Sequence, residues 1–290
     1  MEKTTDVVVV GFGGAGAAAA IEAADAGANL LILEKTGRPG GATRMSAGIV
    51  YAAGSSVQRA AGINDSAEEM YSYYIATDNG MKDPALTRVV AEHSAETIDW
   101  LIKLGADFPP EDIFIGGAEV QFAHVTPPKP RSHHFRTRPG ESVYSGPQLF
   151  SILEEAVKAR GIEVMLQTSA TELLTNSRRE VLGVKASCQG GELIIHARKA
   201  VILADGGFAN NPEMVKQYLT KGPFVAEGKV ILASHPGQTG DAIRMAMALG
   251  ADLCGMASSH ANPDAFVPIG IPTPHHNSGR LPSIFVNARG

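Results

Sequence analysis

Residues 6–35 constrain the fold of this chain more than any other segment. They open with the β-branched run 7–10, a composition typical of a buried parallel strand. The turn at residues 11–16 fits the pattern G-x-G-x-x-G, residues 15–26 predict a helix of small residues, and residues 30–33 predict a second buried strand. Strand, glycine turn, helix and strand in this order are typical of a dinucleotide-binding unit.

The glycines of this turn have different expected tasks. Gly11 permits a tight turn, Gly13 lets the backbone approach a pyrophosphate, and Gly16 lets the helix pack against the strand. Gly14 and Ala15 stand at the start of the helix, where free N–H groups and the helix dipole favour phosphate.

An acidic residue ends the second strand. Glu34 follows the glycines by about 20 residues, where a carboxylate accepts hydrogen bonds from a ribose of the dinucleotide. A 2′-phosphate there would meet a like charge. The sequence therefore favours FAD or NAD over NADP.

The segment that follows, residues 36–54, is rich in glycine and is predicted to be a long loop. Its small residues allow close backbone approach, and the hydroxyls of Thr43 and Ser46 can reach phosphate or flavin. An ordinary flexible loop is the alternative interpretation.

Composition narrows the classes of protein that need to be considered. The chain has 290 residues, 44% of them hydrophobic and 19% charged, as expected of a globular protein with a large core. Its net charge of −5 gives no global basic field for nucleic acid or acidic membranes. Cys188 and Cys254 lack C-x-x-C spacing, the apolar runs are too short to span a membrane, and the first strand leaves no room for a signal peptide. We therefore expect a cytoplasmic location.

Periodicity and punctuation predict the remaining elements. Helices are expected at residues 66–76, 83–105, 147–160 and 239–250, and strands near 162–166, 181–187, 192–196 and 199–204. The three short strands predict a small antiparallel β-meander before the buried strand 199–204. The segment 109–146 carries the basic residues Lys129, Arg131, Arg136 and Arg138. It is either a lid for an anionic substrate or cofactor, or a solvated loop.

Several sequence blocks, taken in order, resemble FAD-binding flavoproteins of the fumarate reductase/succinate dehydrogenase type. They are GFGGAGAAAAIEAADAGA, LILEK, GGATRMSAG, DWLIKLG, AVILADGGF, TGDAIRMAMALGA and IFVNARG. Within that group, residues 48–74 are similar to 3-ketosteroid dehydrogenase-like members. The resemblance implies a Rossmann-like three-layer α/β FAD-binding domain over residues 1–255 and the beginning of a capping domain over residues 256–290.

The glycine motif and the resemblance together imply a set of FAD contacts. The glycine turn would meet the pyrophosphate, Glu34 the ribose, the segment around Ala42 the pyrophosphate and flavin, and Ala170 the adenine. The complete set is Gly11, Gly13, Gly14, Ala15, Gly16, Glu34, Lys35, Gly40, Gly41, Ala42, Thr43, Ser46, Ala47, Gly48, Ile49, Ala170, Ala204, Asp205, Gly206 and Asp241.

The sequence departs from the family pattern at several positions. Asp205 replaces a threonine and places a carboxylate near the phosphates, so its pKa or its orientation is expected to be unusual. TGDA, ending at Ala242, replaces TGDG. The family's His-Pro pair, which binds a substrate carboxylate, aligns with residues 262–263, Asn-Pro, and its Thr-Glu pair falls near residues 274–275, Pro-His. These departures predict a substrate other than fumarate.

Family members continue beyond the equivalent of residue 290, through the rest of the cap and back to a glycine-rich segment that holds the flavin ring. Most of the family's catalytic residues lie in that part. The resemblance therefore leads us to expect that this chain is a truncation or one piece of a larger assembly, prone to association through uncovered apolar surface.

The expected activity is that of an FAD-dependent oxidoreductase acting on an activated carbon–carbon bond of a small molecule, with an enone or ketone, ketosteroid-like, as the favoured substrate. Weak catalytic candidates are Tyr51, His260, His275 and Arg280, each of which can equally be a surface or loop residue. No metal is expected, since the His275–His276 pair lacks supporting spacing. The sequence identifies no electron-transfer partner.

Three alternatives stay open at this point. The first is a catalytically incomplete FAD-binding module that needs a missing part or a partner chain. The second is a fumarate reductase-like reductase of an unsaturated carboxylate. The third is an NAD-dependent dehydrogenase, against which the glycine-rich loop after Glu34 and the ADGGF strand argue, because both suit an extended FAD.

Overall fold

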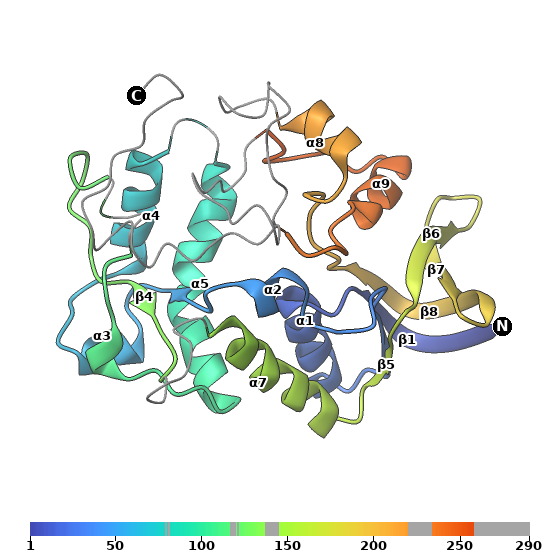
Figure 1. Cartoon of the computed structure of the whole chain (residues 1–290), viewed down its shortest axis with the longest axis horizontal. Helices are drawn as coiled ribbons and strands as arrows, with labels where there is room; N and C mark the ends of the chain where they lie inside the picture. Colours follow the sequence, from blue (N-terminus) through green and yellow to red (C-terminus); the bar gives the residue numbers. More distant parts are fainter. Residues whose placement is uncertain are drawn as a thin grey trace, which may run out of the picture.

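A six-stranded sheet is the largest sheet of the described chain and lies at the right in Figure 1. The computed structural model describes residues 1–78, 80, 82–116, 120, 122–136, 145–219 and 234–257. The strand order is β5-β2-β1-β8-β7-β6. The strands are β1 Glu2–Val10, β2 Leu30–Leu33, β5 Glu163–Met165, β6 Ser169–Thr175, β7 Val181–Cys188 and β8 Gly191–Leu203.

Strands β5, β2, β1 and β8 run parallel, while β7 and β6 continue the sheet antiparallel. Val8 of β1 stands opposite Leu31 of β2 and Val201 of β8, so the run predicted to be a buried parallel strand lies between two neighbours. The predicted α/β class with a central, largely parallel sheet is confirmed.

The alternation of side chains along β1 divides the core in two, because successive residues of a strand point to opposite faces. Val7 and Val9 pack with the helices α1, Gly14–Asp25, and α7, Gly146–Ala159, on one face. Val8 and Val10 pack on the other face with residues of β6, β7 and α9, Asp241–Ala248. Figure 1 shows α1 beside α7, and α9 near the β6–β7 hairpin. The sheet and the elements on its two faces form three layers.

The meander differs from the prediction in its strands. The predicted strands 192–196 and 199–204 are one continuous strand, β8, in which residues 191–196 pair with β7 and residues 194–203 pair with β1. The predicted strand near 162–166, β5, pairs parallel with β2 at the edge of the sheet and does not belong to the meander. The third meander strand is β6, which the alternation pattern misses because register irregularities after Ala170 and Leu174 interrupt its period.

A short hairpin lies away from the large sheet (Figure 1). It pairs β3, Val50–Tyr51, with β4, Ser132–His133. Helices α3 Ser56–Ala60, α4 Ala67–Ala76 and α5 Pro84–Lys103 and the 3₁₀ turn η1 Pro110–Asp112 lie on this side of the molecule. By contrast, α2 Gly41–Met45 packs beside α7, and α8 Pro212–Tyr218 lies beside α9. The prediction of one long loop over residues 36–54 is therefore wrong in part, since α2 and β3 lie within it.

Capping residues explain why α4 and α5 begin where the sequence predicts. Ser66 Oγ accepts a hydrogen bond from Glu69 N at 3.2 Å, and Asp83 Oδ1 accepts one from Ala85 N at 2.8 Å. Only the second half of the predicted apolar face of α5 is buried: Ile98 is inaccessible, whereas Val90 is 59% exposed. The two helices are confirmed with their expected starts.

Arg131, in the middle of the predicted basic segment, lies inside the protein, whereas Lys129 is half-buried and Arg136 is exposed. Arg131 is 2% exposed and its guanidinium makes two hydrogen bonds to Asp65, with Nε–Oδ2 at 2.7 Å and Nη2–Oδ1 at 2.9 Å. His133 is also buried, and its Nε2 lies 2.7 Å from Ser55 Oγ. The solvated-loop interpretation is wrong for this stretch, because a paired carboxylate compensates the buried charge. Arg138 lies outside the described residues.

None of the helices described here combines the length and apolar character needed to cross a membrane. The predicted beginning of a capping domain at residues 256–290 lies almost entirely outside the described residues, so the boundary after residue 255 stays a prediction.

Candidate functional site

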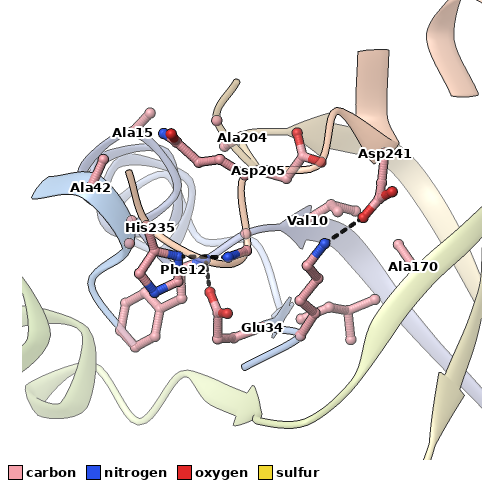
Figure 2. Close-up of a pocket in the computed structure, with 18 of the residues that line it drawn as sticks. Val10, Phe12, Ala15, Glu34, Ala42, Ala170, Ala204, Asp205, His235 and Asp241 are labelled. Carbon is pink, nitrogen blue, oxygen red and sulfur yellow. Dashed lines mark hydrogen bonds and ion pairs between the residues drawn. The ribbon is translucent and has the colours of Figure 1, made fainter. Parts of the chain in front are cut away.

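A cleft lies at the carboxyl ends of β1, β2 and β8, the edge where open parallel sheets bind ligands (Figure 2). Besides the three strand ends, the starts of α1, α2 and α9, the turn before β6 and the loop before α9 contribute to it. Its lining comprises Val10, Gly11, Phe12, Gly13, Gly14, Ala15, Leu33, Glu34, Lys35, Gly41, Ala42, Thr43, Thr168, Ser169, Ala170, Ala204, Asp205, Gly206, His235, Gly237, Gln238 and Asp241.

Fourteen of the twenty residues predicted to contact FAD are in this lining. They come from segments up to 230 residues apart in sequence, from Gly11 to Asp241. The six predicted residues outside the lining are Gly16, Gly40, Ser46, Ala47, Gly48 and Ile49.

In the glycine turn, packing requires glycine at residues 11 and 16 but not at residue 13. Gly11 has a φ of +101°, and a Cβ there would stand 2.5 Å from Ala204 O. A Cβ on Gly16 would collide with the carbonyl of Gly11, so helix and strand could not approach as they do. Gly13 has an ordinary φ of −97°, and the nearest described atom to its Cβ position, Gly40 O, is 3.8 Å away. The space in front of Gly13 therefore suits close approach by a ligand.

The start of α1 faces the same cleft. Gly14 N donates a hydrogen bond to Thr43 Oγ1 at 2.9 Å, which ties α2 to the glycine turn. Among the described residues the N–H of Ala15 has no acceptor, as is usual in the first turn of a helix. The turn thus offers backbone donors at the positive end of the helix dipole.

Glu34 is buried and forms hydrogen bonds with the glycine turn and with the segment after β2. Its Oε2 accepts a hydrogen bond from Phe12 N at 3.1 Å, and its Oε1 accepts from Thr36 N at 2.8 Å and Thr36 Oγ1 at 2.7 Å. A carboxylate has about four acceptor positions, so about one is left for a ligand hydroxyl. Sequence reasoning did not foresee this additional task of fastening the glycine turn.

Lys35 and Asp241 link the end of β2 to the start of α9. Lys35 Nζ lies 2.6 Å from Asp241 Oδ2 and 2.5 Å from Thr239 Oγ1. Burial alone would raise the pKa of Asp241, but the hydrogen bonds and charge of Lys35 outweigh it and hold that pKa below its usual range. The positive charge of Lys35 is therefore already compensated within the cleft.

Asp205 turns toward α9. Its Oδ2 accepts a hydrogen bond from Ala242 N at 2.8 Å, in the first turn of that helix. Burial raises the pKa of Asp205; the hydrogen bond from Ala242 opposes that rise, and the nearby charge of Asp241 adds to it. Both the orientation and the pKa of this carboxylate differ from those of an exposed aspartate.

We expect Asp205→Asn to bind FAD at least as tightly as the parent chain and to unfold at an equal or higher temperature. Asparagine keeps the acceptor for Ala242 N, while the carboxylate that burial disfavours and that repels phosphate is removed. Asp205→Thr should likewise leave FAD binding intact. Flavin fluorescence titration and thermal unfolding check both variants, and complete loss of binding in Asp205→Asn would show a direct contact by the charged group.

The weak catalytic candidates do not meet in this cleft. Tyr51 lies in β3 and packs near Met70 and Ala91, in the cluster of α4 and α5. His260, His275 and Arg280 lie outside the described residues. Within the ranges that the structure describes, no group of three or more His, Cys, Asp or Glu side chains could hold a metal ion.

Eight lining residues had not been singled out from the sequence as cofactor contacts. Phe12 occupies a variable position of the glycine motif, and Thr168 and Ser169 precede β6. His235, Gly237 and Gln238 come from the loop before α9. That loop directly precedes the TGDA block, which was the one signal that could have included it; Val10 and Leu33 complete the lining from their strand ends.

Comparison with known proteins agrees with the architecture of this cleft. The family model described as FAD binding domain matches residues 6–290. The chain is 34% identical over 272 residues to a fumarate reductase (cytochrome) of Shewanella frigidimarina, covering 92% of this chain and 44% of that protein. It is 35% identical over 253 residues to a urocanate reductase of Eggerthella lenta, covering 87% of this chain and 39% of that protein.

A solved structure of similar fold is the 3-ketosteroid-delta4-(5alpha)-dehydrogenase from Rhodococcus jostii RHA1, in complex with 4-androstene-3,17-dione. The two superpose with a TM-score of 0.75 at 32% identity, over 86% of this chain and 55% of the other. The chain thus spans less than half the length of the two reductases it matches. The resemblance to fumarate reductase-type and ketosteroid dehydrogenase-like flavoproteins is confirmed.

Proposed function

The chain belongs to the FAD binding domain family, and from this membership we propose that it is the FAD-holding part of an oxidoreductase acting on an activated carbon–carbon double bond. The cofactor is FAD. The observation that carries the proposal is the open space before Gly13, at the carboxyl end of β1 and beside the first turn of α1. The alternative of an NAD-dependent dehydrogenase is set aside, because an FAD family model matches residues 6–290.

The lining suggests which groups would hold each part of FAD. Gly13, Gly14 and Ala15 would offer backbone to the pyrophosphate, as the motif predicts. Glu34 has about one acceptor position free for a ribose hydroxyl. Ala170, at the start of β6, is proposed to meet the adenine through its backbone.

When bound, FAD supplies the hydride chemistry, and the protein supplies position and electrostatics. In this chain two of the positioning groups are held by hydrogen bonds: Thr43 accepts one from the start of α1, and Glu34 accepts one from the glycine turn. The carboxylate of Asp205 also lines the cleft, between Ala204 and Gly206, and the hydrogen bond from Ala242 N fixes its direction toward α9.

The substrate class is proposed from the chemistry common to the relatives. Fumarate and urocanate carry a C=C bond conjugated to a carboxylate, and 4-androstene-3,17-dione carries one conjugated to a ketone. We propose an enone-type small molecule, because Asn-Pro at residues 262–263 replaces the pair that binds a carboxylate in the fumarate reductases. An unsaturated carboxylate is the second choice. The cytoplasmic location and the absence of a nucleic-acid partner stay predictions.

A second candidate concerns the 290-residue chain by itself: FAD binding without turnover. It is favoured by the coverage, since the chain matches only 44% of the fumarate reductase. The proposal names no electron-transfer partner.

The first test is the visible absorption spectrum of the purified chain with added FAD, followed by gel filtration. We expect flavin bands to elute with the protein, since the cleft already contains groups for the pyrophosphate and ribose. Enones and an artificial electron acceptor would then be screened for turnover. A folded chain that elutes colourless would contradict FAD holding by this chain, and a flavin-loaded but inactive chain would support the second candidate.

A further inference from the structure

His235 lies in the cleft, on a loop that Asn210 holds by hydrogen bonds. Asn210 Nδ2 donates hydrogen bonds to His235 O at 2.8 Å and to Ser234 O at 3.0 Å, and Asn210 N donates to Gln238 O at 2.8 Å. A Cβ on Gly237 would stand 3.4 Å from Thr36 Cγ2, so the loop reaches across to the segment after β2. The half-buried imidazole is therefore held beside the glycine turn (Figure 2).

One hydrogen bond selects the tautomer of this ring. Gly237 N donates to His235 Nδ1 at 3.1 Å, so Nδ1 is an acceptor and the neutral ring carries its proton on Nε2. Among the described residues, Nε2 has no hydrogen-bond partner. The ring thus has one N–H donor to offer to a ligand.

The charged side chains of the described lining offer no free cation to a phosphate. They are Glu34, Lys35, Asp205 and Asp241, from the ends of β2 and β8 and the start of α9. Lys35 is engaged by Asp241, and the remaining two groups are carboxylates. A pyrophosphate at Gly13 would therefore depend on backbone N–H groups and on any neutral N–H donor that the described lining supplies.

We propose that His235, as the neutral tautomer with its proton on Nε2, donates a hydrogen bond to a phosphate oxygen of the bound dinucleotide. The inference rests on the proposed FAD site and adds a residue to it. A second proton on the ring would sit on Nδ1 and face the N–H of Gly237, so the hydrogen bond from Gly237 favours the neutral donor. The expected gain in FAD affinity is that of one hydrogen bond to a charged acceptor.

Two substitutions separate the two nitrogens. In His235→Asn the side-chain oxygen can still accept from Gly237 N, but the group that corresponds to Nε2 is lost. In His235→Gln the longer amide can reach the position of Nε2 and keep a neutral donor there. The first variant removes the donor while the turn is kept, and the second restores a donor.

The experiment is a titration of the full 290-residue chain with FAD at pH 8, followed by flavin fluorescence, for the parent and both variants. We expect the Kd of His235→Asn to be about tenfold higher than that of the parent, as for the loss of one hydrogen bond to a charged group. The Kd of His235→Gln should stay within about twofold of the parent value, because the amide keeps a donor near the position of Nε2.

ADP is titrated in parallel at pH 8, because it carries the adenine, ribose and phosphates without the flavin. If the parent binds neither FAD nor ADP, both the FAD site and this inference are overturned. If the parent binds FAD but all three proteins share one Kd, the inference alone is overturned. Thermal unfolding of His235→Asn checks that a higher Kd does not come from a loss of folded structure.

Discussion

Replacing Gly13 by valine should weaken FAD binding at least about a hundredfold without unfolding the chain. The Cβ position of Gly13 opens toward the cleft, and the branched side chain would occupy the space that a pyrophosphate needs for contact with the backbone. The loss corresponds to about 3 kcal/mol, of the order of two charge-assisted hydrogen bonds. Flavin retained after gel filtration, and the Kd from fluorescence titration, measure the effect.

A matched control comes from Gly37, which is exposed and also has an ordinary backbone conformation. Its Cβ position lies 3.8 Å or more from its nearest neighbours, all in the side chain of Gln167, and it does not line the cleft. Gly37→Val should bind FAD like the parent. Gly13 precedes α1 as its N-cap, so Gly13→Val is expected to lose about 1 kcal/mol of stability. Unchanged FAD affinity in Gly13→Val would show that the pyrophosphate does not bind at this position.

Glu34→Ala is a less selective test of FAD binding than the motif suggests, because it should also lower stability. Its carboxylate holds Phe12 N and Thr36 N in a buried position, so the substitution would leave backbone donors unpaired as well as remove a ribose contact. The glycine motif predicts the ligand role, because its spacing is local. The structural role depends on how the end of β2 meets the turn after β1, which no local pattern contains.

The same distinction explains which parts of the fold followed from the sequence. β1, α1 and β2 follow from short-range periodicity and glycine placement, and α4 and α5 from caps at Ser66 and Asp83. β6 does not, because its register irregularities hide the alternation of buried residues. His235 joins the cleft through a loop held by Asn210, a contact between segments whose approach only the folded chain defines.

The basic segment around residue 131 shows the limit most clearly. Arg131 and Lys129 look from the sequence like charges on a solvated loop, yet Arg131 is buried against Asp65, 66 residues earlier. Charge in a sequence indicates solvent exposure only when no distant partner compensates it. This pair joins the segment before α4 to the strand β4, and it leads to the second large prediction.

Arg131→Met should destabilise the protein by about 3–5 kcal/mol, as should Asp65→Leu, because each removes the hydrogen-bonded partner of a buried charge. Arg131→Met leaves Asp65 with the more distant cation Lys129, whose Nζ lies 3.8 Å from Asp65 Oδ1. Both side chains are almost inaccessible, at 2% for Arg131 and 0% for Asp65, so water cannot replace the missing group without local opening. Chemical denaturation at pH 7 measures the free energy of unfolding. A control is Arg178→Met, which removes an ion pair to Glu180 from a side chain that is 79% exposed, and should change stability by less than about 1 kcal/mol.

The double variant and the pH dependence decide whether charge is the cause. Arg131→Met combined with Asp65→Leu should be more stable than the sum of the single changes predicts, because no unpaired charge remains. Burial alone would raise the pKa of Asp65, but the hydrogen bonds and charge of Arg131 hold it below its usual value of 3.8. A carboxyl with a lowered folded-state pKa contributes stability that is fully present above its unfolded-state pKa and is lost as the pH falls through its folded-state value. Between pH 5 and more acidic solution, the parent should therefore lose stability more steeply than the double variant. Equal acid sensitivity, together with additive losses, would show that these residues act through packing volume and not as an ion pair.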